Sequence, residues 1–261
     1  MNHSIAYRRI LHKMGYYDYQ QGLIYHHLSQ EGGWNSHLKN CREFILMSFE
    51  FYKPSVVTVL GSGWLLDFPL KEIAGKVSQV NLVDIIHPPE VISQVAEIKN
   101  VILRDDDISG GLISEVWQKA GTRSVLNKLR SIGEIEPPGY KPLFEPGMVV
   151  SLNILTQLES LPVRLLKKKA IADEESYLNF RKKIQQDHIT FLKKHQSVLI
   201  TDLSEVVTES SGRVTEINSV LADLPVGHIR KEWTWYFEGR SSDYYRKKSV
   251  FRVAAILFDN G

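Results

Sequence analysis

Between residues 54 and 259, short apolar runs alternate with amphipathic stretches. Five runs are short, contain many β-branched residues and end at glycine or a polar group, which predicts buried strands: SVVTVLG, QVNLVD, NVILRDDD, MVVSLNIL and SVLITDLS. Helical patterns lie between them, in LLDFPLKEIAGK, PEVISQVAEIK, SEVWQKAGTRSVLNKLRSI and about residues 160–195. Strands that alternate with helices predict a parallel sheet covered by helices on both faces.

Residues 1–53 show helical periodicity without strand signals. In SHLKNCREFILMSFEFY, one face carries residues at three- and four-residue steps: Leu38, Cys41, Ile45, Ser48 and Phe49. Gly32 and Gly33 divide the region into at least two helices, and Pro54 ends it because proline cannot continue a hydrogen-bonded helix. We therefore expect an N-terminal helical cap over 1–53 and one α/β domain over 54–261.

The C-terminus reads as two strands, EWTWYFE and FRVAAILFD, joined by the polar segment GRSSDYYRKK. The connection is too short for a crossover helix, so the last strand must run antiparallel. The expected fold is a Rossmann-like, seven-stranded, mostly parallel sheet with an antiparallel last strand. In the helix after the first strand, Asp67 is expected to be the N-cap.

Candidate chemistry gathers where the first three strands end. Gly61, Ser62 and Gly63 follow the first strand, where glycine permits a ligand to approach the backbone closely. Asp84 ends the second strand, where an acid can accept both hydroxyls of a ribose. Asp107 belongs to an acidic triplet that closes the third strand, where an acid can accept a base amino group.

These residues resemble the pattern of the class I S-adenosylmethionine-dependent methyltransferases, with VLGSG, NLVD and DDDI in matching order and spacing. LGSGWLLDFPL, LVDIIHPPE and VVSLNILTQL further resemble a group of bacterial methyltransferase-like proteins. The resemblance implies that S-adenosylmethionine is the cofactor, and it implies the following roles. Gly61, Ser62 and Gly63 hold its amino-acid part, Asp84 the ribose, Asp107 and the amide of Ile108 the adenine, and Ser151 and Asn153 the floor near the methyl group.

Two positions depart from the family pattern. Val59 replaces the usual acid before the first glycine, and Leu65 replaces the usual third glycine, so the following helix must sit differently. These departures motivate an alternative, in which the fold is a non-catalytic binding or scaffolding module. NAD is disfavoured because its fingerprint requires glycine at the position of Leu66.

Methyl transfer requires a base only when the accepting nucleophile starts protonated. Asp202, at the end of the fifth strand, and His87, in DIIHPPE, are the candidate bases. His188 is interpreted as a surface histidine of its helix. Trp235 or Tyr236 could line the acceptor pocket, although packing against the sheet is the simpler interpretation of both.

Composition narrows the classes without naming the acceptor. Over 261 residues the net charge is +2, too balanced to argue for nucleic acid, and the basic clusters of the long helical region are diluted by acids. An RNA methyltransferase therefore stays a weaker alternative to a small-molecule enzyme. Cys41 is the only cysteine, so a cysteine-based zinc site is not expected, and neither is any other metal site. The start of the chain has no signal-peptide core, and no apolar run approaches the roughly 20 residues that span a bilayer. A cytoplasmic protein with no membrane partner is expected.

Overall fold

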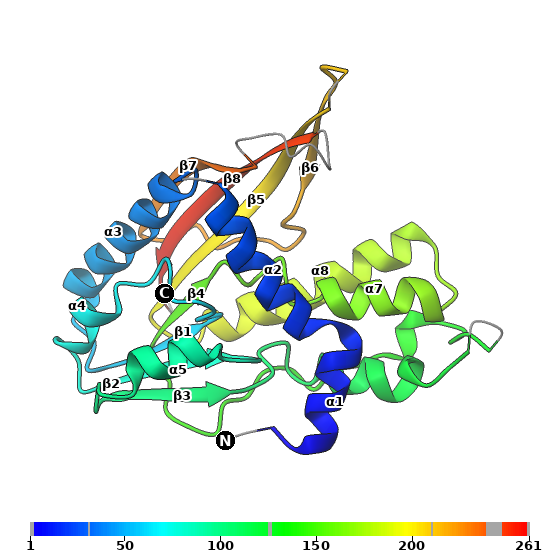
Figure 1. Cartoon of the computed structure of the whole chain (residues 1–261), viewed down its shortest axis with the longest axis horizontal. Helices are drawn as coiled ribbons and strands as arrows, with labels where there is room; N and C mark the ends of the chain where they lie inside the picture. The colour runs from blue at the N-terminus through cyan, green and yellow to red at the C-terminus, as the bar shows by residue number, and fades with distance from the viewer. Residues whose placement is uncertain (1–2, 31, 125–126, 210, 239–246, 260–261) are drawn as a thin grey trace.

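Five parallel strands form the first part of the sheet (Figure 1). In this computed structural model, which describes residues 3–30, 32–124, 127–209, 211–238 and 247–259, the strands are β1 (Val56–Leu60), β2 (Gln79–Asp84), β3 (Val101–Asp105), β4 (Met148–Leu152) and β5 (Ser197–Glu209). β1 pairs with β2 on one side and β4 on the other, in parallel register. The full order is β3-β2-β1-β4-β5-β8-β7. Strand order reverses beside β1, so the carboxyl ends of β1, β2 and β4 surround the place where open α/β sheets bind ligands.

The C-terminal strands confirm the antiparallel end of the sheet. β7 (Ile229–Glu238) and β8 (Lys247–Phe258) pair antiparallel, and β8 also runs antiparallel to β5. Within the described residues the sheet has eight strands, one more than expected. β5 continues beyond the expected run to Glu209, and β6 (Val214–Asn218) pairs antiparallel with its extension. This extension was missed because its positions are only partly buried or exposed, as are those of β6, and both segments contain few strong apolar residues.

The two faces of the sheet are covered by different helices (Figure 1). One face packs against α3 (Asn35–Tyr52), α4 (Leu70–Ala74) and α5 (Pro89–Val95). The other packs against α1 (Ile5–Met14), α6 (Leu112–Val116), α7 (Ser160–Lys169) and α8 (Glu174–Leu192). Burial of both faces explains why the central strands are nearly continuous apolar runs.

In the described part of the chain three helices precede β1, in agreement with the expectation of at least two. α2 (Tyr16–Ser29) separates from α1 at Gly15, whose φ of 89° lies in the left-handed region that favours glycine. No residue of α2 is fully buried, although Gln20 and Leu23 line a pocket beneath it. α3 ends before Pro54 as expected, and it buries Cys41, which the periodicity placed on its inner face.

Several expected helices are shorter in the structure. The helix expected over 65–76 is only α4, and its N-cap position is Pro69, so the assignment of Asp67 as the cap is wrong. The stretch expected to be helical to Ile132 leaves the helix after a π-helical turn, Trp117–Gly121, and only a short 3-10 turn, Ile132–Glu134, follows. The long charged region forms two helices, α7 and α8.

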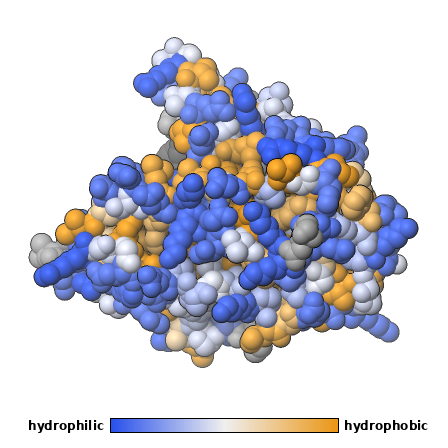
Figure 2. Space-filling model, turned by 180° about the vertical axis from the view of Figure 1, so that it is seen from behind, coloured by the Kyte–Doolittle hydropathy of each residue, from blue (hydrophilic) through white to orange (hydrophobic). Residues whose placement is uncertain are grey.

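The end of the β5–β6 hairpin projects from the body of the molecule (Figure 1), and Figure 2 shows hydrophobic surface interspersed with hydrophilic surface on the opposite side. On β6, Val214 and Ile217 are exposed. No helix in the described parts of the chain is long and apolar enough to cross a membrane.

Candidate functional site

A pocket opens at the carboxyl ends of β1, β2 and β4, beneath α2. Its empty volume is about 1010 Å³ when its open mouth is counted. Much of its polar lining comes from the segments that follow β1, β2 and β4: Ser62, Asp67, Asp84, Asn153 and Gln157. Gln20 of α2 and His37 of α3 also line it. Two carboxylates and no lysine or arginine are among the described residues that line it, which favours a ligand with positive charge over an anion.

The turn after β1 lies close to the end of β4. Gly61 has a φ of 81°, and a Cβ at this position would lie 2.8 Å from the Cβ of Ile154 and 2.9 Å from the carbonyl oxygen of Leu152. Gly63 has a φ of 46°, and a Cβ there would meet nothing closer than 3.9 Å. Gly61 is therefore required both by its backbone conformation and by the close approach of β4, whereas Gly63 is required mainly by conformation.

Leu65 stands at the position of the expected third glycine and adopts a backbone conformation that is usual for glycine. Its φ is 57°, in the left-handed region, and its side chain is buried between the sheet and α3. No helix begins directly after the turn, because α4 starts only at Leu70. Val59 is likewise a fully buried core residue, so the position of the usual family acid faces the interior packing.

Asp84 holds the turn in place. Its Oδ2 accepts a hydrogen bond from the Gly63 amide at 2.8 Å, and its Oδ1 accepts one from the Ile85 amide at 2.7 Å. Burial raises the pKa of Asp84, and the neighbouring His87 and the backbone amides oppose that shift. The carboxylate thus lies in the pocket at the end of β2, next to Gly61–Gly63.

His87 connects the turn to β3 and lies outside the pocket lining. Its Nε2 is 3.2 Å from the Ser62 hydroxyl, and its Nδ1 is 2.8 Å from Oδ1 of Asp105. This is the order of groups in a Ser-His-Asp relay, but the Ser62 side chain is fully buried. The three groups therefore fix the turn against β2 and β3, and offer no exposed nucleophile.

Asp107 and Ile108 lie apart from the pocket. Asp107 accepts hydrogen bonds from the amide of Ser109 at 3.0 Å, from the Ser109 hydroxyl and from the Tyr7 hydroxyl at 3.4 Å. Ile108 is buried in the core on the α1 face. Helix α1 therefore covers the place where the resemblance locates an adenine.

Ser151 and Asn153, at the end of β4, point in different directions. The Ser151 hydroxyl lies 2.8 Å from Nε2 of His188, and both are buried beneath α8. The interpretation of His188 as a surface residue is wrong, because the inner face of α8 includes polar positions that an apolar pattern does not reveal. Asn153 has a φ of 51° and lines the pocket.

Asp202 lies beside the pocket without lining it. The Thr156 hydroxyl donates to its Oδ1 at 2.5 Å, and burial raises the pKa of its carboxyl group. Its charge raises the pKa of Tyr19, after the larger effect of burial, and Tyr19 does line the pocket. Asp202 is therefore one layer removed from the space that a ligand would occupy.

An aromatic wall closes the pocket on the side of the N-terminal helices and β7. It consists of Tyr16, Tyr19, Trp34, Trp64 and Trp235. Trp235 faces inward, as the less favoured interpretation had it, whereas Tyr236 is 54% exposed because successive strand residues point to opposite faces.

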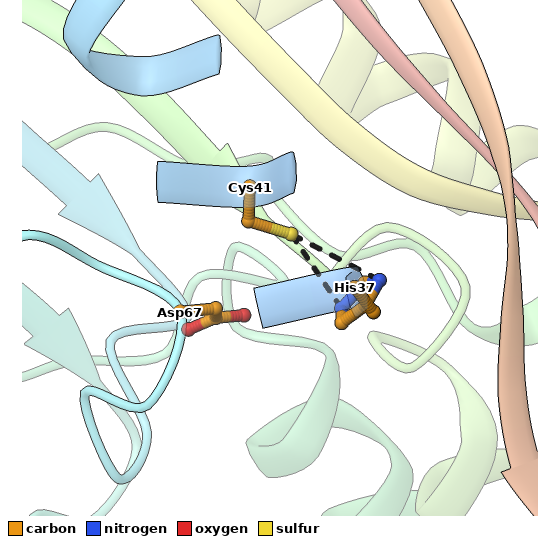
Figure 3. Close-up of side chains that lie close together, drawn as sticks. All are labelled: His37, Cys41 and Asp67. Carbon is orange, nitrogen blue, oxygen red and sulfur yellow. Dashed lines mark hydrogen bonds between the residues drawn. The ribbon is translucent and has the colours of Figure 1, made fainter. Parts of the chain in front are cut away.

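A cluster that sequence reasoning missed lies at the foot of this wall: His37, Cys41 and Asp67 (Figure 3). The first two are four residues apart on the buried face of α3, and Asp67 comes from the segment between β1 and α4. The Asp67 carboxylate accepts a hydrogen bond from Nδ2 of Asn153 at 2.7 Å. The i, i+4 spacing of His37 and Cys41 was the available signal, but nothing in the sequence indicated that Asp67 would join them.

Comparison with known proteins finds similarity in structure and none in sequence. No protein-family model matches the chain, and no curated protein matches it. The N-methyltransferase NodS from Bradyrhizobium japonicum WM9, in complex with S-adenosylhomocysteine, is 9% identical, with a TM-score of 0.36 over 83% of this chain and 85% of that one. The 1,6-didemethyltoxoflavin-N1-methyltransferase of Burkholderia thailandensis is 10% identical, with a TM-score of 0.41 over 98% of this chain and 91% of that one. A putative RNA methyltransferase from Pyrococcus horikoshii is 10% identical, with a TM-score of 0.33 over 84% and 83%. The assignment of the Rossmann-like methyltransferase fold rests on the strand order and directions of this chain.

Proposed function

We propose that this chain is an S-adenosylmethionine-dependent methyltransferase that acts on a small-molecule acceptor. The observation that carries the proposal is the pocket at the strand ends, where the turn Gly61–Gly63 and Asp84 face an aromatic wall. Asp84 would accept the ribose hydroxyls, and the turn would leave space for the amino-acid part of the cofactor. The absence of lysine and arginine from the described lining suits a cofactor that carries a sulfonium and an ammonium.

The residues around the pocket would act mainly by orientation. Methyl transfer is an in-line displacement, so the protein must align the acceptor and exclude water. The aromatic wall supplies flat, apolar surface for an organic acceptor, mostly from residues 1–53, which we propose as a cap on the domain 54–261. Asp202 is the candidate base that lies beside the pocket, and because it does not line the pocket it would act through Tyr19, which does. His87 acts as a positioning residue through Ser62.

Calorimetric titration with S-adenosylmethionine, S-adenosylhomocysteine and NAD tests the cofactor. We expect micromolar binding of the first two and none of NAD. Asp84→Asn keeps the side-chain volume but removes the charge, and loss of a hydrogen bond to a charged group costs about 1.5–3 kcal/mol, or roughly tenfold or more in affinity. Glu90→Gln, at an exposed position of α5, makes the same charge change and should leave binding unaltered. Undiminished binding by Asp84→Asn would refute the role of Asp84.

A second candidate function has a specific observation in its favour. Tyr7 of α1 donates to Asp107, so the proposed adenine site is already covered by the protein itself. A non-catalytic module would bind none of the three ligands at concentrations far above micromolar. Tyr7→Phe separates the two candidates further. It removes one of the two donors to Oδ2 of Asp107 and leaves the Ile113 amide, so it should strengthen cofactor binding only if adenine uses that site.

A further inference from the structure

The cluster of His37, Cys41 and Asp67 has the composition of a metal site, and its ligand atoms lie close enough to converge on one ion. Nε2 of His37 lies 3.5 Å from Sγ of Cys41, and one ligand atom from each of the three residues lies within 4.8 Å of the others. Zinc bonds of about 2.0–2.1 Å to nitrogen and 2.3 Å to sulfur place two tetrahedral ligands roughly 3.5 Å apart. The histidine and cysteine are therefore spaced to share one tetrahedral ion without movement of α3.

Without a bound cation, the protein supplies little positive charge to stabilise a Cys41 thiolate and an Asp67 carboxylate. His37 and Cys41 are almost completely buried. Burial raises the pKa of the Cys41 thiol and of the Asp67 carboxyl group, and the positive charge of Arg42 only partly opposes both shifts. A buried divalent cation would favour the thiolate and the carboxylate together.

The Asn153 side chain connects the cluster to the pocket. Nδ2 of Asn153 donates to Oδ2 of Asp67 at 2.7 Å and lies 3.3 Å from Nε2 of His37. Among the described residues, Oδ1 of the same amide is a buried side-chain oxygen with no hydrogen bond. His37, Asp67 and Asn153 all line the pocket, whereas Cys41 lies behind them. Catalytic zinc sites have three ligands from the protein and keep the fourth coordination position open toward a pocket. The cluster has the same arrangement.

We propose that His37, Cys41 and Asp67 bind one zinc ion, whose fourth coordination position faces the pocket. The Zn–S bond forms as the Cys41 thiol proton leaves to solvent. This site goes beyond the proposed methyl transfer and does not depend on it. It also differs from the sequence-based expectation, because a single cysteine suffices when a histidine and a carboxylate complete the set.

Trp233 would report on metal binding. Its indole nitrogen lies 3.1 Å from Nδ1 of His37, and an indole N–H can only donate. In the metal-free protein Nδ1 therefore accepts, and the ring proton is on Nε2. A metal at Nε2 moves this proton to Nδ1 and breaks the hydrogen bond from Trp233. It also replaces the contacts that Nε2 makes with Cys41 and Asn153. Trp235 stacks on the same ring, with centroids 3.9 Å apart, so tryptophan fluorescence should change on loading.

Cobalt titration of the full chain, after treatment with a chelator, gives the direct test. Because Cys41 is the only cysteine, any thiolate-to-cobalt charge-transfer absorption comes from it. We expect this absorption to saturate at one cobalt per chain, to be accompanied by the fluorescence change and to disappear when zinc is added. Cys41→Ser should lose the absorption, and Asp67→Asn should weaken cobalt binding at least tenfold. Asp18→Asn, an exposed acid on α2, should bind as the unaltered chain does.

Measurements on the unaltered protein are sufficient to overturn the proposal. A chain that shows no thiolate absorption with cobalt, and no rise in melting temperature with zinc, has no such site, whatever the variants do. Equal cobalt affinity of the unaltered chain and Asp67→Asn would remove Asp67 from the ligand set. These outcomes are independent of S-adenosylhomocysteine binding, which is measured separately.

Discussion

Replacing Gly61 by alanine tests whether the turn after β1 is held tightly against β4. Gly212, in the turn between β5 and β6, provides a matched control, because both glycines have a φ of 81°. An added Cβ at Gly212 meets nothing within 4 Å, whereas at Gly61 it meets the Ile154 side chain at 2.8 Å and the Leu152 carbonyl at 2.9 Å. The left-handed backbone strain is thus common to both variants, and only one has the steric clash.

The magnitudes follow from these two contributions. Alanine in the left-handed region costs about 1–2 kcal/mol, and its lower entropy in the unfolded chain offsets about 0.4–1 kcal/mol. We therefore expect Gly212→Ala to lower the free energy of unfolding by about 1 kcal/mol. Overpacking adds about 1–3 kcal/mol at Gly61, which gives a loss of roughly 2–4 kcal/mol for Gly61→Ala.

Urea unfolding followed by circular dichroism measures both losses by linear extrapolation. Equal losses, within about 0.5 kcal/mol, the usual range for neutral surface changes, would refute the argument that close approach to β4 requires glycine. If the turn also holds the cofactor, Gly61→Ala should weaken S-adenosylhomocysteine binding and Gly212→Ala should leave it unchanged. A loss of stability without a loss of binding would show that the turn has a packing role only.

Two further predictions concern buried polar groups on the face of the sheet that α7 and α8 cover. Burial lowers the pKa of His188 from 6.5 to about 4, so the stability that comes from its neutral form is present above pH 6.5 and is lost as the pH falls toward 4. This loss amounts to ~3 kcal/mol. The free energy of unfolding in urea should therefore decrease less between pH 7 and pH 4 for His188→Gln than for the unaltered chain. An equal decrease for both proteins would contradict this prediction. Glu159 is buried, with its Oε1 3.0 Å from Nε of Arg181, so Arg181→Met should lower the free energy of unfolding by about 3 kcal/mol or more, because it leaves a buried charge with fewer partners. The double variant Glu159→Leu, Arg181→Met should recover most of that loss, and an additive double variant would contradict this account.

The sequence by itself determined the elements whose signals are local. The five apolar runs, the turn at Gly61–Gly63 and the two C-terminal strands were predictable, because β-branched residues, glycine and short connections constrain the backbone directly. The order of the polar groups at the strand ends was predictable for the same reason, since parallel strands bring their carboxyl ends to one edge. Asp84 beside the glycine turn follows from this alone.

Only the tertiary structure decided which side chains meet. His188 and Ser151 are brought together by the packing of α8, and Tyr7 reaches Asp107 because α1 folds back across the sheet. His37, Cys41 and Asp67 form a cluster because a helix before β1 packs beside the segment after it. The pattern of apolar and polar residues in a segment shows which of its faces can be buried. It does not show which other segment will cover that face. Contacts between segments distant in sequence depend on packing that no single segment encodes.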